Sequence, residues 1–168
     1  TPFAETAPGV VAYLGDEGRR EVGVSDSRSI AVNDSGSDVL LRIKNGNGTF
    51  VTAAAGANAG TGVVSPGSVV NASALTAHNY SITFSVAAGE TRYSVLDTTS
   101  GATVVTNAAY VPGGPIAFDG LQLAIEGDPA NGDSFSVRPS SNVGVFATLD
   151  ALRTALQGVG SGATENTR

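Results

Sequence analysis

The chain contains no cysteine, no methionine and no tryptophan, and each absence narrows what it can do. Without cysteine it has no disulfide, no thiol nucleophile and no zinc–thiolate site. Its single histidine, His78, excludes a multi-histidine metal cluster and lies in an expected loop, where we interpret it as an ordinary solvated residue. No serine stands in a G-x-S-x-G motif and no phosphate-binding G-x-x-x-x-G-K-[ST] loop is present. The sequence therefore predicts no catalytic, cofactor-binding or metal site, and no enzyme.

Positive charge and long apolar runs are also scarce. Nine Lys and Arg residues face fifteen Asp and Glu residues, which gives a net charge of -6 and a pI near 4.5. No basic surface for nucleic acid or an anionic membrane is expected from this balance. No apolar run approaches the ~20 residues of a membrane span, and no cleavable signal sequence opens the chain. A start without methionine suggests a processed protein or a piece of a longer one.

The residues that are present indicate a β-rich protein with many turns. The chain has 168 residues, a mean hydropathy of +0.10 and 22 glycines, which suits one domain with appendages. Its clearest segment is 110–137, which we interpret as two β-hairpins that share a central strand, with a tight turn at Asp119-Gly120 and a looser turn at 128–133. Alternating apolar residues flank the pair Asp119-Gly120. An Asp-Gly pair between alternating runs predicts a two-residue hairpin turn. That turn places Phe118 opposite Leu121 and Ile116 opposite Leu123, all on one face.

Other segments repeat this pattern of short strands and turns. We expect the core to contain Ile82, Phe84, Val95, Ile116, Phe118, Leu121, Leu123, Ile125, Phe135 and Val137. Further strands are expected at 19–24, 29–33, 49–52, 63–64, 69–70, 79–86, 92–95 and 104–105. Residues 1–12 are interpreted as an extended arm, 39–41 as one helical turn and 53–78 as a long loop. The predicted fold is mainly β, an antiparallel β-sandwich or partly open barrel of hairpins, with one short C-terminal helix.

The C-terminal helix is expected over residues 145–157, which contain no glycine or proline. Val145, Leu149, Leu152 and Leu156 recur at spacings of four, three and four, which makes a heptad-like stripe. Because so short a helix is marginal alone, the stripe needs a partner, either the β domain or another helix. The segment 161–168 is expected to be a polar tail.

Two groups of oxygen-bearing side chains offer weaker candidates for chemistry. Asp128, Asn131 and Asp133 could act as calcium ligands or simply form a turn, and their spacing does not match a calcium loop. Asp119, Glu126 and Asp133 suggest a glycosidase pair, but Asp119 is needed in its turn. Four N-x-[ST] sequons, typical of glycosylation but common in chains rich in Ser and Thr, begin at Asn33, Asn47, Asn71 and Asn79.

Several segments in the same order resemble the middle of a flagellar family. The segments 10–20 (VVAYLGDEGRR), 29–39, 47–51 (NGTFV), 116–121, 127–135 (GDPANGDSF) and 145–152 carry the likeness. They are similar to the hook-associated protein 3 family of hook–filament junction proteins, related to flagellin. The likeness covers most of the chain and is weakest over 53–110.

The resemblance implies a non-enzymatic structural adaptor of the bacterial flagellum, exported without a cleaved signal peptide. It implies β-hairpin elements flanking a stem in 1–44, an outer β domain in 45–139, and the start of a stem helix with a polar tail in 140–168. The long terminal stem helices of that family are mostly absent. Implied partners are the second junction protein, flagellin and copies of the chain itself, while the isolated chain is expected to be monomeric. The alternative is a secreted glycan-binding or adhesive β module.

Overall fold

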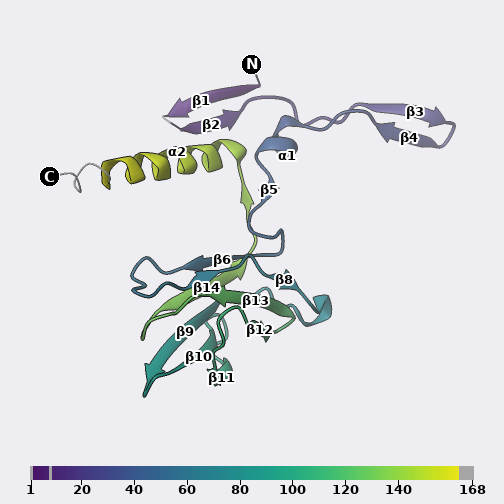
Figure 1. Cartoon of the computed structure of the whole chain (residues 1–168). Helices are drawn as coiled ribbons and strands as arrows, with labels where there is room; N and C mark the ends of the chain where they lie inside the picture. The colour runs from purple at the N-terminus through teal and green to yellow at the C-terminus, as the bar shows by residue number, and fades with distance from the viewer. Residues whose placement is uncertain (1, 8, 163–168) are drawn as a thin grey trace. The chain divides into compact units, whose positions relative to one another are not determined.

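The chain is built mostly of antiparallel strands, with one long helix near its C-terminal end (Figure 1). The structure, a computed structural model, describes residues 2–7 and 9–162, with side chains up to Gln157. The chain divides into two compact units. One unit comprises Thr1–Ile43 and Asn142–Arg168, and the other comprises Lys44–Ser141.

The unit Lys44–Ser141 contains a five-stranded antiparallel sheet in the order β11-β10-β9-β14-β6. Its strands are β6 (Phe50–Ala54), β9 (Tyr80–Ala87), β10 (Glu90–Asp97), β11 (Thr103–Ala109) and β14 (Ser134–Pro139). β9 and β10 are joined by Ala88 and Gly89, whose φ values are 53° and 81°. Positive φ at both central residues suits a tight turn whose twist matches that of the strands.

A second sheet in the same unit is organised around β13 (Leu121–Glu126). β13 pairs with β12 (Pro115–Phe118) and with two short strands, β7 (Val63–Val64) and β8 (Ser68–Val69). The hairpin predicted at Asp119-Gly120 is confirmed, because Phe118 pairs with Leu121 and Ile116 with Leu123. The second hairpin predicted in 110–137 is wrong, because β14 crosses to the other sheet and pairs with β9 and β6 rather than with β13. Of the short strands expected within the loop 53–78, the first forms at 63–64 as predicted and the second lies one residue earlier than predicted, at 68–69. The structure adds the 3₁₀ turn η1 (Ala72–Ala74).

Both sheets contribute to a single core. All ten predicted core residues are buried, and Phe50 and Tyr80 join them. The rings of Tyr80 on β9 and Phe118 on β12 lie 4.9 Å apart, so the two sheets meet directly. The fold is therefore mainly β, as predicted, with facing antiparallel sheets, and no barrel closes within the described residues.

The other unit contains two hairpins and two helices. The hairpins are β1 (Phe3–Ala7) with β2 (Val10–Tyr13) and β3 (Glu21–Ser25) with β4 (Arg28–Ala31). The expected arm at 1–12 was therefore wrong, because a turn that includes Gly9, at φ 77°, folds it back into a hairpin. The helical turn predicted at 39–41 is α1 (Gly36–Leu40), which begins earlier because the Ser35 hydroxyl accepts a hydrogen bond from Asp38 N at 3.1 Å.

The C-terminal helix α2 spans Val145–Gly162. It begins where predicted but continues five residues beyond 157, although each glycine there lowers helix stability by about 1 kcal/mol relative to alanine. Of the predicted polar tail, Ser161 and Gly162 are helical and 163–168 lie outside the described residues. Two short strands, β5 (Ile43–Lys44) and β15 (Asn142–Val143), pair where the chain passes between units. No helix in the described part is long and apolar enough to cross a membrane.

Candidate functional site

His78 is held by a buried carboxylate rather than fully solvated, which corrects the expectation from the sequence. Its Nδ1 lies 2.7 Å from Asp97 Oδ2, and Ser100 Oγ donates to the same oxygen. Burial raises the pKa of Asp97, but the hydrogen bonds from Ser100, His78 and backbone amides outweigh it and hold the pKa well below its usual range. In a nucleophilic triad the histidine stands between serine and acid. Here the acid stands between them, so the Ser100 hydroxyl bonds to the carboxylate and not to the imidazole.

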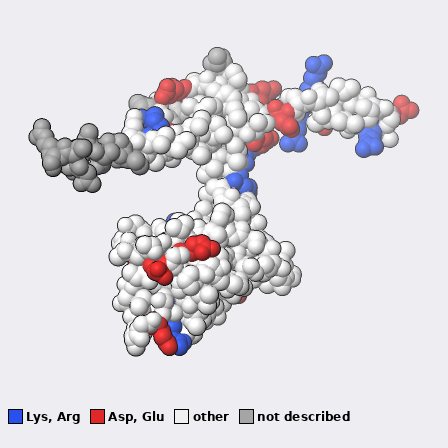
Figure 2. Space-filling view, in the orientation of Figure 1, with Lys and Arg blue, Asp and Glu red and all other residues white. Residues whose placement is uncertain are grey.

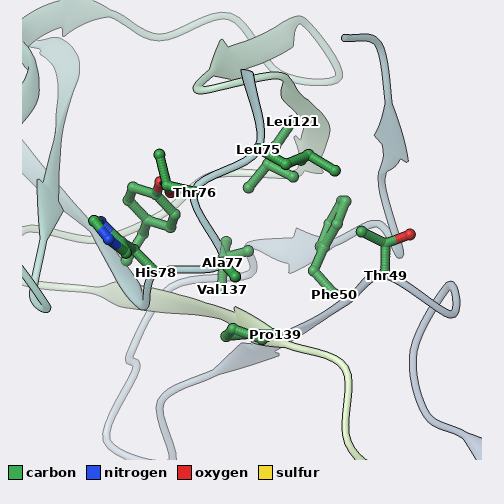
Figure 3. A pocket seen from close by; sticks show the side chains of 10 residues that line it. Thr49, Phe50, Leu75, Thr76, Ala77, His78, Leu121, Val137 and Pro139 are labelled. Carbon is green, nitrogen blue, oxygen red and sulfur yellow. The ribbon is translucent and has the colours of Figure 1, made fainter. Parts of the chain in front are cut away.

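A small pocket lies beside His78 (Figure 3). Its volume is about 70 Å³, far below the roughly 300–1,000 Å³ of small-molecule sites. Its walls are mainly apolar and come from Phe50, Leu75, Ala77, Leu121, Val137 and Pro139. Such a pocket is too small for an organic cofactor.

The polar groups of this pocket support the fold. Tyr80 OH donates to Asp119 Oδ2 at 2.8 Å and lies against the Thr76 hydroxyl. Burial raises the pKa of Tyr80 to about 12, and the Asp119 carboxylate contributes to the same shift. The tyrosine therefore stays protonated and links the segment before β9 to the β12–β13 turn.

Two of the three candidate calcium ligands, Asn131 and Asp133, accept hydrogen bonds from backbone amides, while Asp128 is exposed. Both oxygens of buried Asp133 are occupied, because Oδ1 accepts from Ala59 N at 2.8 Å and Oδ2 from Gly60 N and Ala130 N. Asn131 Oδ1 accepts from Val86 N at 3.0 Å. The described residues include no group of three or more His, Asp or Glu side chains placed to hold a metal ion. The arrangement supports the turn interpretation.

The suggested glycosidase carboxylates stand apart. Asp119 lies in the turn before β13 and Glu126 is the last residue of that strand, and six residues of strand cover about 20 Å. Catalytic carboxylates in glycosidases are separated by roughly 5–9.5 Å. Asp133 is buried and its oxygens are already bonded. These three side chains do not form one site.

Two sequon asparagines hold loops together. Asn47 Nδ2 donates to the carbonyls of Pro66 and Gly67, and its Oδ1 accepts from Thr49 N and Phe50 N. Asn33 Oδ1 accepts from the backbone amide of Arg20. Their sequence signal is the preference of asparagine for turns, and the segment 45–48 is accordingly interpreted as a turn from the sequence.

The surface offers little for a sugar or a polyanion. All ten aromatic side chains are buried or half-buried, so the described chain presents no exposed ring for stacking on a glycan. Charged residues are sparse and mixed in sign on the face shown in Figure 2. Neither pattern favours the alternative of a glycan-binding module.

The exposed apolar surface of α2 is more distinctive. Leu149, Leu152 and Leu156 are 58%, 54% and 65% exposed, so the described residues of the same unit leave the stripe uncovered. The helix is anchored instead by Phe146, whose ring lies 5.5 Å from that of Phe3. Sequence analysis missed Phe146 because it lies one residue off the heptad stripe. A helix anchored on one side with leucines exposed on another is suited to assembly.

Comparison with known proteins identifies the family. Residues 53–139, more than half of the chain, match the family model for the D2-like domain of flagellar hook-associated protein 1. The chain therefore belongs to the flagellar hook-associated proteins, as its resemblance to hook-associated protein 3 predicted. A comparison with curated protein sequences finds no significant match.

Solved structures narrow the likeness to junction proteins. The flagellar junction protein FlgL from Legionella pneumophila is similar with a TM-score of 0.78 and 34% identity, over 89% of this chain and 48% of that one. A second Legionella pneumophila structure, described as flagellar hook-associated protein-3, has a TM-score of 0.76 and 34% identity, again over 89% of this chain and 48% of that one. FlgL from Xanthomonas campestris has a TM-score of 0.73 and 33% identity, over 89% of this chain and 47% of that one. The chain spans about half the length of these proteins.

Proposed function

We propose that the chain acts as a structural adaptor subunit at the bacterial flagellar hook–filament junction, outside the cell. The observation that carries this is the TM-score of 0.78 to a flagellar junction protein over 89% of the chain, at 34% identity. As an adaptor it would link the hook-side junction protein to flagellin and contact copies of itself. It would reach its position by export without a cleaved signal peptide.

The role is mechanical and non-enzymatic. The candidate carboxylates Asp97, Asp119 and Asp133 are bound to hydrogen-bond donors within the fold. Residues 45–139 would form the outer β domain, and 1–44 the hairpin elements flanking a stem. Residues 140–168 would start a stem helix, so the α2 leucines would face other helices of the assembly. The isolated chain would be monomeric, since three leucines are a small surface.

Immunogold electron microscopy of flagella from the bacterium that carries this protein tests the proposal. An antibody against Lys44–Ser141 is expected to label one band between hook and filament, because a junction subunit occupies only that level. A strain lacking the gene is the control for antibody specificity. Label along the whole filament, only at the distal tip, or absent from flagella would contradict the proposal.

A further inference from the structure

The hairpin of β3 and β4 has an uncovered apolar side. Every residue of both strands is exposed, and Figure 1 shows the pair as a separate two-stranded ribbon. Val22 pairs with Ile30, so both side chains lie on the same face. Arg28 precedes Ile30 by two residues and shares that face. An isolated two-stranded hairpin is marginally stable in water, so this face needs a partner.

An apolar hollow lies elsewhere in the same unit, between the β1–β2 hairpin and α2. Val11 and Phe146 line two adjoining pockets of about 240 and 270 Å³, and Val10 lines the first of them. The rim carries the carboxylates of Glu5 and Asp150. Asp150 is paired with Arg153 at 2.6 Å. Glu5 accepts only the Gly9 amide and belongs to no ion pair among the described residues.

We propose that the apolar side of the β3–β4 hairpin of one copy docks into this hollow on a neighbouring copy of the chain. Val22 and Ile30 would cover the apolar floor, and Arg28 would reach Glu5. Arg28 also belongs to no ion pair within the described part, so the two charges complement each other. This inference rests on the proposed function, in which the chain is a repeated subunit.

The two surfaces differ, so the contact is head-to-tail. A repeated head-to-tail contact closes into a ring or continues as an open helix, depending on the rotation between copies. The hairpin is too small for a stable dimer, because strands of four or five residues span about 17 Å and stable interfaces bury about 800 Å² per partner. The contact is therefore weak between free copies and forms when assembly raises their effective concentration.

Disulfide trapping tests the contact, and the absence of native cysteine makes every variant a single-cysteine protein. Copies carrying Val22→Cys are mixed with copies carrying Val10→Cys at millimolar concentration under oxidising conditions. Mixed dimers are expected to form faster than Val22→Cys homodimers. The matched control is Ser29→Cys, which lies on the opposite face of the same hairpin, mixed with the Val10→Cys copy.

Charge changes supply the second arm. Arg28→Glu in the hairpin-donating copy, or Glu5→Arg in the accepting copy, is expected to slow trapping by about two- to fivefold, as for an exposed ion pair. Combining the two reversed copies should restore the rate. Glu5→Gln, which keeps the acceptor for Gly9 N, should also slow trapping without disturbing the β1–β2 turn. Circular dichroism confirms that each variant folds.

Three results would overturn the inference. Predominant Val22→Cys homodimers would mean that hairpins stack on each other. Mixed dimers no faster than those of the Ser29→Cys control would mean that the hairpin face does not dock there. A trapping rate that none of the charge changes alters would show that Arg28 and Glu5 do not pair across the contact. A junction band in immunogold microscopy together with any of these would leave the adaptor function standing, so the two failures are distinguishable.

Discussion

Gly120 is the residue on which the β12–β13 hairpin depends most directly. Its φ is 78°, and a Cβ at this position would collide with the carbonyl oxygen of Asn71. Gly132 has a similar φ of 88°, but open space surrounds the position of its Cβ. Alanine substitutions at these two glycines therefore separate the cost of a positive φ, which both share, from the cost of a clash, which only Gly120 has.

We expect Gly120→Ala to destabilise the chain more than Gly132→Ala. Positive φ costs an alanine about 1–2 kcal/mol, and the collision at Gly120 adds backbone displacement to that. Urea unfolding at neutral pH measures both variants against the unaltered chain. Equal losses in the two variants would show that Asn71 moves aside freely and that the close approach has no energetic weight.

At the residue scale, the sequence predicted those turns and strand pairings that depend on neighbouring residues alone, through apolar alternation and turn-forming residues. Asp119 and Gly120 specified a turn, and the turn specified that Phe118 pairs with Leu121. Phe50 was missed because its burial depends on β6 pairing with β14, more than 80 residues later. The bond between His78 and Asp97 likewise joins segments that no local pattern connects.

Among the elements, the loop before β7 and the turn before β14 are tied together by Asp133. The side chain accepts backbone hydrogen bonds from Ala59 and Gly60 in the loop and from Ala130 in the turn. Those from Ala59 and Ala130, with a smaller one from Gly60, hold the pKa of Asp133 below its usual range despite burial. A carboxylate whose pKa is lower folded than unfolded stabilises the fold above the unfolded pKa, near 3.9. That stability is lost as the pH falls through the folded pKa.

Asp133→Asn is therefore expected to lower the free energy of unfolding at pH 7. It should also make the loss of stability below pH 4 shallower, because one group with a depressed pKa is gone. Urea unfolding from pH 7 to pH 2 gives both quantities. Asp128→Asn, at an exposed residue of the same turn, is the matched control. An unchanged acid profile in Asp133→Asn would show that other carboxylates determine the acid sensitivity.

Strands were more predictable than their surroundings. The β12–β13 hairpin at Asp119-Gly120 and the β9–β10 hairpin at Ala88-Gly89 formed as expected, because periodicity and turn residues agreed. The β1–β2 hairpin was missed because its alanine-rich strands show no alternation. The end of α2 was placed too early because glycine lowers helix propensity without abolishing a helix.

At the scale of the whole molecule, the β unit is self-contained and the other unit is open. All core residues lie in Lys44–Ser141. The exposed leucines of α2 and the exposed β3–β4 hairpin both belong to the other unit. This distribution favours an assembly surface on the helix and hairpins, with the β unit providing spacing and surface identity. The family was predictable from ordered motifs, whereas exposure of the stripe was visible only in the structure.

Filament counting tests this account most directly, in a full-length protein that contains the chain, expressed in a strain lacking its own copy. One variant replaces residues 45–139 by a short Gly/Ser linker. The second replaces Leu149, Leu152 and Leu156 by serine, with Ala151, Thr154 and Gln157 replaced by serine as the matched control on the same helix. We predict that the linker variant and the control still attach filaments and that the leucine variant attaches none. Filaments on the leucine variant and none on the linker variant would contradict the account, because the β unit would then be the adaptor.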